Sequence, residues 1–131
     1  MIDVVAALIF KDGRFLICKR PKNKARGGLW EFPGGKTEPL ETHEQALFRE
    51  CREELAVEIS VGEKLMTVIY EYPDVKVSLS LFLCSLKSGS PHLLEHSEMC
   101  WITASQLDDF DFCPADAEIL KMIKKRFCEA I

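Results

Sequence analysis

Residues 35–57 read GKTEPLETHEQALFRECREELAV, and this stretch decides the fold. It combines a glycine-rich turn, a helix start and a dense group of carboxylates. On a helix spanning residues 42–55, the side chains of Glu50, Glu53 and Glu54 fall within an arc of roughly 100°. The neighbouring arc carries apolar side chains expected to face the core: Leu47, Phe48, Cys51 and Leu55. Because the three like charges repel one another, a divalent cation that prefers oxygen ligands, Mg²⁺ or Mn²⁺, would turn this cost into a binding site.

The start of this helix is well marked. Thr42 and Gln45 have the spacing of a capping box, in which two side chains satisfy free backbone amides. Immediately upstream, residues 32–35 (FPGG) cannot form a regular helix, and their glycines allow backbone to approach a ligand or metal. A solvated acidic face with Arg49 and Arg52 as ordinary charge partners is the alternative interpretation of the glutamates alone. The preceding glycine turn at its fixed spacing favours a ligand site.

The same segment resembles the Nudix box, G-x5-E-x7-R-E-U-x-E-E-x-G-U, in which U is a bulky aliphatic residue. The matching residues are Gly35, Glu41, Arg49, Glu50, Glu53, Glu54 and Val57. Cys51 departs from the pattern at the first U and is expected to pack as a small apolar side chain. Ala56 replaces the last glycine, where a left-handed backbone would cost it about 1 kcal/mol. Neither change touches an expected metal ligand.

Length and composition limit the possible classes of protein. The resemblance covers the chain from end to end, and 131 residues provide one hydrophobic core, so we expect a single Nudix domain over residues 1–131. A net charge of −4 and the lack of a basic block argue against a nucleic-acid polymer as partner. There is neither an apolar run long enough for a membrane span nor a signal-peptide pattern, so we expect no membrane partner and a cytoplasmic location.

The cysteines are expected to be reduced and buried, as in a cytosolic protein, because none forms a CxxC pair and most lie in apolar stretches. Their positions are 18, 51, 84, 100, 113 and 128. His96 and Cys100 have side chains typical of metal ligands, but no second pair of ligands accompanies them. We therefore expect no metal site there.

The hydrophobic pattern predicts mixed α/β order. Strands are expected at residues 4–10, 14–19, 63–72, 75–86 and 99–102, with turns at 11–13 and 73–74. Residues 20–29 are expected to form a polar, basic loop. A short helix is expected from Thr103, and a final amphipathic helix from about Pro114 to Cys128, with Ile119, Leu120, Ile123 and Phe127 facing inward. The pattern alone predicts α/β or α+β; the resemblance implies a Nudix α/β/α sandwich with a mixed β-sheet between helices.

Within the Nudix family the chain is similar to the MutT-like nucleoside-triphosphate pyrophosphatases, in particular to the CTP pyrophosphohydrolase and 8-oxo-dGTP diphosphatase group. The matching segments are residues 4–7, 19–21, 28–36, 95–96 ahead of Trp101, and 114–116. This resemblance implies metal-dependent hydrolysis of a nucleoside triphosphate, of the CTP, 5-methyl-dCTP or 8-oxo-dGTP type, to the monophosphate and pyrophosphate. Two alternatives stay open. One is a Nudix hydrolase of a nucleotide sugar or dinucleotide; the other is a non-catalytic nucleotide-binding module.

The family also implies a metal site with Mg²⁺, or Mn²⁺ as a substitute. By match, its ligands would be the Gly34 carbonyl and the carboxylates of Glu50, Glu53, Glu54 and Glu95. Glu98 is the alternative to Glu95, which could also be a solvated loop residue. Either Glu50 or Glu95 is expected to act as general base, since a carboxylate beside a cation is ionised and can accept the proton of water. Arg49 is expected to orient this cluster by pairing with Glu41.

Four residues match substrate-binding positions of the family: Arg20, Phe32, Lys36 and Asp116. Arg20 and Lys36 would contact phosphate, Arg through two parallel hydrogen bonds and Lys as a point charge. Phe32 would line the nucleobase pocket, although an aromatic residue before two glycines is as often part of the core. Asp116 replaces the Asn of the MutT prototype, which weakens the case for strict 8-oxo-guanine selectivity, and it could equally serve the helix dipole. We expect a small nucleotide as the binding partner of a monomer or homodimer.

Overall fold

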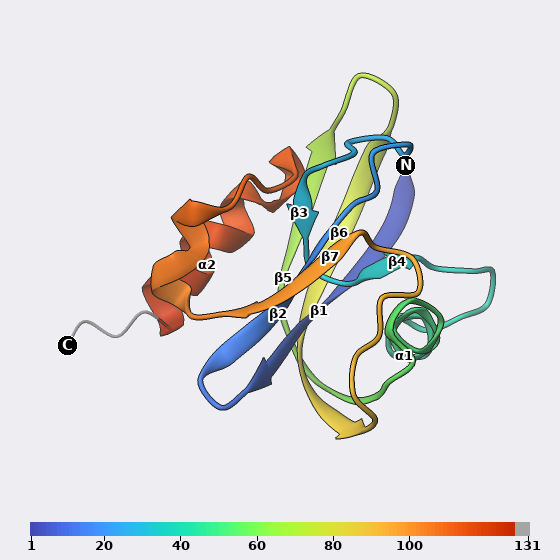
Figure 1. Ribbon diagram of the computed structural model, residues 1–131. Helices are drawn as coiled ribbons and strands as arrows, with labels where there is room; N and C mark the ends of the chain where they lie inside the picture. Colours follow the sequence, from blue (N-terminus) through green and yellow to red (C-terminus); the bar gives the residue numbers. More distant parts are fainter. Residues whose placement is uncertain (128–131) are drawn as a thin grey trace.

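The computed structural model describes residues 1–127, and a mixed β-sheet forms its centre (Figure 1). Its strands are β1 (Ile2–Lys11), β2 (Arg14–Lys19), β3 (Trp30–Glu31), β4 (Gly34–Lys36), β5 (Glu58–Glu71), β6 (Lys76–Ser88) and β7 (Glu98–Ile102). The strand order is β3-β2-β1-β6-β5, with β4 also paired to β1 and β7 to β2. β1 and β6 run parallel, and the other pairs are antiparallel. The expected mixed sheet is therefore confirmed.

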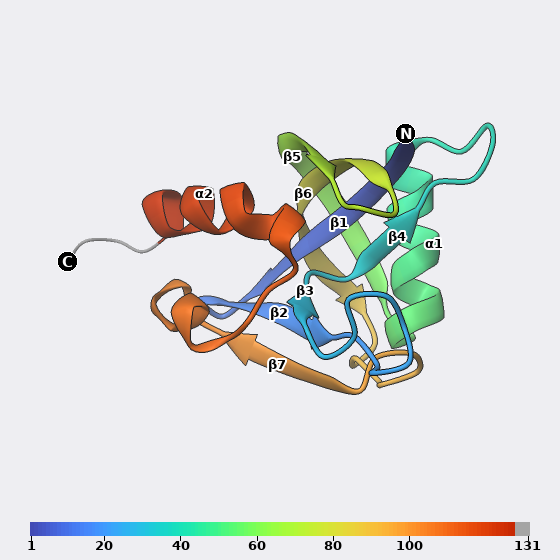
Figure 2. The same cartoon turned by 90° about the horizontal axis from the view of Figure 1, so that it is seen from above.

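Helices cover both faces of this sheet (Figures 1 and 2). They are the α-helices α1 (His43–Leu55) and α2 (Ala117–Phe127) and the 3-10 helices η1 (Ala104–Asp109) and η2 (Pro114–Asp116). Successive side chains of β1 explain the two faces: Val5 and Ala7 pack in the cluster that contains α1, and Ala6 and Leu8 in the cluster that contains α2. A strand buried on both sides reads as a continuous apolar run, as residues 4–10 do.

Both ends of α1 have the geometry that the sequence predicts. Thr42 Oγ1 accepts a hydrogen bond from the Gln45 amide at 3.0 Å, and Gln45 Oε1 accepts one from the Thr42 amide at 3.0 Å. The helix ends at Leu55, and the capping residue Ala56 has a left-handed φ of 57° and ψ of 37°. Its inner face buries Ala46, Leu47, Cys51 and Leu55. The burial of this face determines the orientation of α1 and therefore the position of its glutamates.

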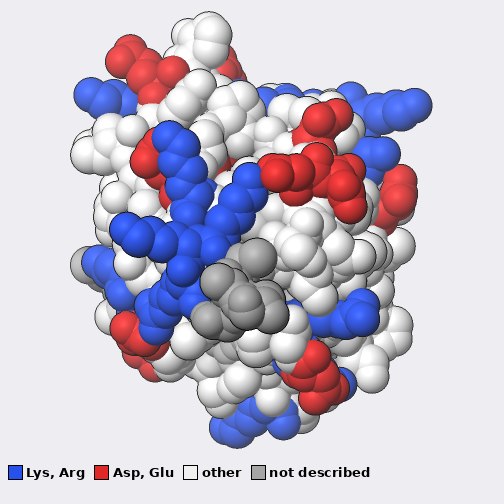
Figure 3. Space-filling view, turned by 90° about the vertical axis from the view of Figure 1, so that its left-hand side faces the viewer, with Lys and Arg blue, Asp and Glu red and all other residues white. Residues whose placement is uncertain are grey.

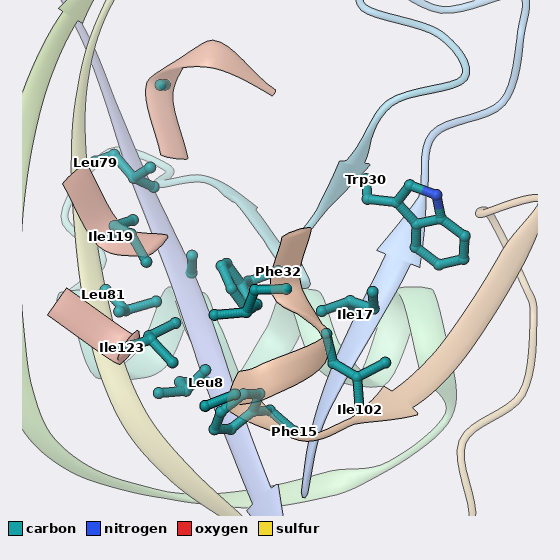
Figure 4. Close-up of a cluster of buried hydrophobic side chains, with 14 residues drawn as sticks. Leu8, Phe15, Ile17, Trp30, Phe32, Leu79, Leu81, Ile102, Ile119 and Ile123 are labelled. Atoms are coloured by element: carbon teal, nitrogen blue, oxygen red, sulfur yellow. The ribbon is translucent and has the colours of Figure 1, made fainter. Parts of the chain in front are cut away.

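The larger core cluster lies between the sheet and α2 (Figure 4). Ile119 and Ile123 of α2 are fully buried there, against the strand residues that Figure 4 labels. Leu120 and Phe127 are half-buried and pack against the same cluster. The inward face expected for the last helix is thus confirmed, while its expected end at Cys128 lies outside the described residues.

Several expected boundaries were wrong. No strand was expected at residues 30–36, yet β3 and β4 form there, and β4 pairs Gly35 with Val5; glycines give no alternating pattern that would predict a strand. β5 begins at Glu58 rather than Glu63, because it stays paired with β6 across an irregularity between Val61 and Lys64. The short helix expected from Thr103 is confirmed as η1, with Thr103 at its N-cap, and helical structure begins at Pro114 as expected, although its first three residues form η2 and α2 begins at Ala117.

The outer side of α2 carries clustered positive charge, visible as a blue area in Figure 3. Lys124, Lys125 and Arg126 occupy the last turn of this helix. Two of them pair with acidic neighbours, Lys124 with Asp108 and Arg126 with Glu63. Such exposed ion pairs contribute little stability, but they balance the local charge. None of the helices within residues 1–127 is long and apolar enough to span a membrane.

The cysteines of the described part of the chain are free thiols. Cys18, Cys51, Cys84 and Cys113 are buried, and Cys100 is half-buried. Burial raises the pKa of Cys84 to about 12, so this thiol stays protonated and packs as an apolar group. Cys128 lies outside the described residues.

Candidate active site

A cavity of about 530 Å³ lies among β1, β4, α1, the loop after β2, the β5–β6 turn and η2. Eight of the residues expected from the sequence line it: Arg20, Phe32, Gly34, Lys36, Glu50, Glu54, Glu95 and Asp116. These residues come from five separate parts of the chain, so the fold brings them together. Arg49 and Glu53 are not among the lining residues.

The acidic wall of the cavity belongs to α1. Glu54 is only 8% exposed and accepts a hydrogen bond from the Gly34 amide at 3.3 Å. Burial, followed by the charges of Glu50 and Glu31, raises the pKa of Glu54 to about 9. Burial also raises the pKa of Glu50, although Arg49 opposes the shift. The wall is therefore a place where negative charge is costly without a cation.

Glycines at 34 and 35 allow this wall to form. A Cβ at Gly35 would lie 2.5 Å from Cδ of Glu50, so a larger residue would displace the carboxylate. Gly34 has a φ of 156°, and a Cβ there would meet the Val5 carbonyl oxygen at 1.9 Å. β4 can thus lie between β1 and α1 only with these residues.

Arg49 holds the cluster from outside the cavity. Its Nη1 lies 3.0 Å from Glu50 Oε2 and 3.2 Å from Glu53 Oε1. Its Nη2 donates to the Lys36 carbonyl at 3.1 Å. The expected pairing with Glu41 is present, and this hydrogen bond is the main reason that the pKa of Glu41 falls to about 2. Glu53 has a half-exposed side chain, so it is directed to Arg49 and solvent rather than into the cavity.

The buried carboxylate of Glu54 tests whether the site suits a divalent cation. Burial and the charges of its neighbours disfavour the ionised form and raise its pKa, and a cation would offset that cost. Carboxylate oxygens are the ligands that Mg²⁺ and Mn²⁺ prefer. Within residues 1–127, no three acidic, His or Cys side chains are gathered into a ready-made metal cage. The fit therefore rests on donor chemistry and burial.

Of the two candidate loop glutamates, Glu95 lines the cavity and Glu98 does not. The Glu95 side chain is 46% exposed, with Lys24 Nζ at 4.0 Å. Glu98 lies on β7 and forms an ion pair with Lys19 at 3.2 Å. This geometry favours Glu95 as the cavity residue.

Glu31 is a cavity residue that sequence reasoning missed. Its Oε1 lies 3.0 Å from Arg20 Nη1, and its Oε2 lies 3.0 Å from Nε2 of the buried His96. His96 thus pairs with an acidic side chain of the cavity. The position of Glu31 inside the segment 28–36, which carries the family resemblance, was the available signal. Side-chain hydrogen bonds across 65 residues are not visible in the sequence.

The apolar part of the cavity contains the expected nucleobase residues. Phe32 is 3% exposed and stacks on Phe112 with ring centroids 5.5 Å apart, so it is both core and cavity wall. Asp116 is 4% exposed in η2. Burial, with the charge of Glu31 as a second cause, raises the pKa of Asp116 well above its usual range. A protonated Asp116 can donate a hydrogen bond as well as accept one.

Comparisons with known proteins agree with this geometry. A family model described as NUDIX domain matches residues 4–122. The CTP pyrophosphohydrolase of Escherichia coli K12 is 38% identical over 121 residues, which cover 92% of this chain and 90% of that protein. The 8-oxo-dGTP diphosphatase of the same strain is 32% identical over 118 residues, covering 88% of this chain and 89% of that protein. The crystal structure of a MutT protein from Methanosarcina mazei Go1 superposes with a TM-score of 0.84 at 25% identity, covering 95% of this chain and 93% of that one.

Proposed function

The chain belongs to the Nudix family of hydrolases, and from this we propose that it hydrolyses nucleoside triphosphates to nucleoside monophosphate and pyrophosphate. We further propose that its substrates are of the CTP, 5-methyl-dCTP or 8-oxo-dGTP type, so that it acts in nucleotide-pool sanitation. Relatives at 38% and 32% identity are named for CTP and for 8-oxo-dGTP, which supports this range of substrates.

One observation carries the proposal. A single cavity contains the basic side chains of Arg20 and Lys36, the acidic wall of Glu50 and Glu54, and the buried Asp116 beside aromatic residues. A nucleoside triphosphate has the matching parts: an anionic tail that needs cations and a flat base that needs an apolar slot with polar contacts. A non-catalytic nucleotide-binding module would have no need to keep acids that repel each other in its cavity wall.

We propose that Mg²⁺, or Mn²⁺ in its place, binds at this wall. The Gly34 carbonyl and the carboxylates of Glu50, Glu54 and Glu95 would hold it, and Glu53 would join them by turning its side chain from Arg49 toward the cavity. When bound, the cation supplies neutralisation of phosphate charge and activation of water. The buried Glu54 supports this proposal, because burial and the neighbouring carboxylates disfavour its ionised form and a cation would offset that cost.

The side chains of the protein would bind and orient the substrate. Arg20 is poised for phosphate because Glu31 and the Ala25 carbonyl hold its guanidinium, the latter at 2.8 Å from Nε. Lys36 adds an exposed charge at the cavity edge. Glu50 or Glu95 would accept the proton of the attacking water, and Arg49 would keep Glu50 in place. Phe32 would line the pocket of the base, and Asp116 would bind the edge of the base.

The first test is a panel of CTP, 5-methyl-dCTP and 8-oxo-dGTP, with kcat/KM measured in Mg²⁺ and in Mn²⁺. We expect metal-dependent turnover with pyrophosphate and monophosphate as products. A nucleotide sugar and a dinucleotide belong in the same panel, because cleavage of these alone, to two monophosphates, would identify a different Nudix substrate. Absence of turnover with every compound would leave a binding module.

A matched pair of variants tests the metal ligands. We expect Glu53→Gln to fold normally but to lose nearly all turnover and to bind Mn²⁺ more weakly in calorimetry, because a charged ligand is lost. Glu44→Gln removes an exposed charge from the same helix outside the cavity and serves as control. Wild-type rates and Mn²⁺ affinity in Glu53→Gln would remove this residue from the metal site.

A further inference from the structure

Two segments far apart in the sequence meet at Arg26, on the rim of the cavity. Arg26 belongs to the loop between β2 and β3, and Tyr72 and Asp74 belong to the turn between β5 and β6. The Arg26 guanidinium lies 4.1 Å from the centroid of the Tyr72 ring, and its Nη1 lies 3.1 Å from Asp74 Oδ1. All three residues line the cavity. A stacked and ion-paired arginine joins the two segments more firmly than either contact alone.

Arg26 is also linked to the phosphate side of the cavity. Its left-handed backbone, with a φ of 58°, is unusual for a residue with a side chain and indicates that local contacts hold it. The preceding carbonyl, that of Ala25, accepts a hydrogen bond from Arg20 Nε at 2.8 Å. The same guanidinium of Arg20 binds Glu31. Holding Arg26 therefore holds the backbone that orients Arg20.

Tyr72 is linked to the nucleobase side. Its hydroxyl oxygen accepts a hydrogen bond from the Ala115 amide at 2.9 Å. Ala115 precedes Asp116 in η2, a 3-10 turn of only three residues. Such a short turn has few internal hydrogen bonds, so an outside acceptor fixes its orientation. The hydroxyl of Tyr72 thus helps to set where the Asp116 carboxyl points.

We propose that Arg26, Tyr72 and Asp74 form a clasp across the cavity rim that positions both ends of the substrate site, Arg20 through Arg26 and Asp116 through Tyr72. Arg26 and Tyr72 are positioning residues, and the two effects are separable. Arg26 governs binding of the phosphate tail for every nucleotide, and the Tyr72 hydroxyl governs discrimination among bases. This inference rests on the proposed function, because it assigns phosphate to Arg20 and base to Asp116.

Arg26→Ala tests the phosphate side. Loss of the stack and the ion pair loosens the backbone that carries the Ala25 carbonyl, and with it the hydrogen bond that orients Arg20. We therefore expect KM to rise roughly 3- to 10-fold for each nucleotide in the panel, while kcat changes less and the order of preference stays the same. Lys22→Ala is the matched control, since Lys22 is an exposed cation of the same loop outside the cavity. An unchanged KM in Arg26→Ala, or an equal rise in Lys22→Ala, would overturn this half of the proposal.

Tyr72→Phe tests the base side, because it keeps the ring under Arg26 and removes only the hydroxyl. We expect the ratio of kcat/KM between CTP and 8-oxo-dGTP to change roughly 3- to 10-fold, with the general KM rise of Arg26→Ala absent. A Tyr72→Phe variant with the wild-type ratio would overturn the assignment to base discrimination.

A measurement without substrate separates the clasp from the proposed function. In Tyr72→Phe we expect faster amide hydrogen exchange at Ala115 by NMR, whereas Arg26→Ala and Lys22→Ala leave it close to wild type. Unchanged exchange at Ala115 in Tyr72→Phe would contradict the clasp whatever the enzyme hydrolyses. Failure of the proposed function would instead appear in the wild-type protein, as an absence of nucleotide turnover.

Discussion

Arg49 binds Glu41 with two parallel hydrogen bonds, from Nε to Oε2 at 2.7 Å and from Nη2 to Oε1 at 2.9 Å. The remaining nitrogen, Nη1, reaches Glu50 at 3.0 Å. Because the planar guanidinium is fixed by one carboxylate, its direction toward the other is fixed as well. Glu41, outside the cavity, thereby orients Glu50, which lines it.

The bonds between Arg49 and Glu41 lead to the first prediction. Arg49→Lys keeps the charge but cannot form the two parallel bonds, so we expect turnover to fall roughly 10- to 100-fold, as it would if Glu50 is the proposed metal ligand that Arg49 orients. Arg52→Lys, an exposed arginine of the same helix, is the control. Comparable losses in both variants would show that the effect belongs to the helix rather than to the orientation of Glu50.

Glu54 makes the metal-free protein sensitive to pH. The pKa of its carboxyl rises from an ordinary 4.5 to about 9 in the folded state, mainly through burial. Between these values the folded state keeps a proton that the unfolded state has lost, so the free energy of unfolding falls as pH rises. The stabilising contribution of the Glu54 proton is complete below pH 4.5 and is lost as the pH rises to about 9.

We therefore expect Glu54→Gln to flatten this dependence and to be more stable than wild type at alkaline pH without metal. The wild-type slope contributed by this group would be about 1.4 kcal/mol per pH unit at most. Urea unfolding across the pH range, with chelator and with Mg²⁺, measures it. Mg²⁺ should stabilise the wild type more than the variant; equal stabilisation would remove Glu54 from the metal site.

The extent of prediction from sequence differed between elements. α1 was predicted closely, because a capping box, an apolar stripe and the capping position of Ala56 all act within neighbouring residues. β4 was missed, because its two glycines are selected by contacts with Val5 and Glu50, which lie far away in the sequence. Strand pairing between residues far apart in the sequence leaves little trace in the local pattern of residue types.

The same contrast holds in the site. Eight of the residues that the family match selected lie in one cavity of the structure, although the role of each stays a prediction. Glu31, Arg26 and Tyr72 were not found, since their contacts join the cavity rim through long-range hydrogen bonds and a stacked ring. Glu53 was expected beside Glu50 and Glu54, but its half-exposed side chain is held by Arg49.

Ala56 offers a prediction about stability alone. Its left-handed backbone disfavours a Cβ, so Ala56→Gly is expected to raise the free energy of unfolding by about 1 kcal/mol. Arg52→Gly, within the same helix, is expected to lower it by about the same amount, because glycine weakens a helix interior. Denaturant unfolding of both variants checks the opposite signs. A loss of stability in Ala56→Gly would contradict the strain assigned to this end of the helix.

Asp116 is predicted to control the choice of base. Asp116→Asn replaces a protonatable acid by a fixed donor and acceptor, so we expect the order of kcat/KM among CTP, 5-methyl-dCTP and 8-oxo-dGTP to change by about tenfold between the extremes. Asp109→Asn, an exposed change in η1, is the control. An unchanged order of kcat/KM among the three nucleotides would show that Asp116 is a structural residue of η2.

The general base is predicted from preorganisation. Glu50 is held by Arg49 at 3.0 Å and lies directly against Gly35, whereas Glu95 is nearly half exposed with its closest cation 4.0 Å away. A group already held in place loses less freedom in the transition state. We expect Glu50→Gln to reduce kcat by roughly 100-fold or more, and Glu95→Gln by roughly tenfold. Single-turnover rates at saturating Mg²⁺ make the comparison, and a larger loss in Glu95→Gln would transfer the role of base to that residue.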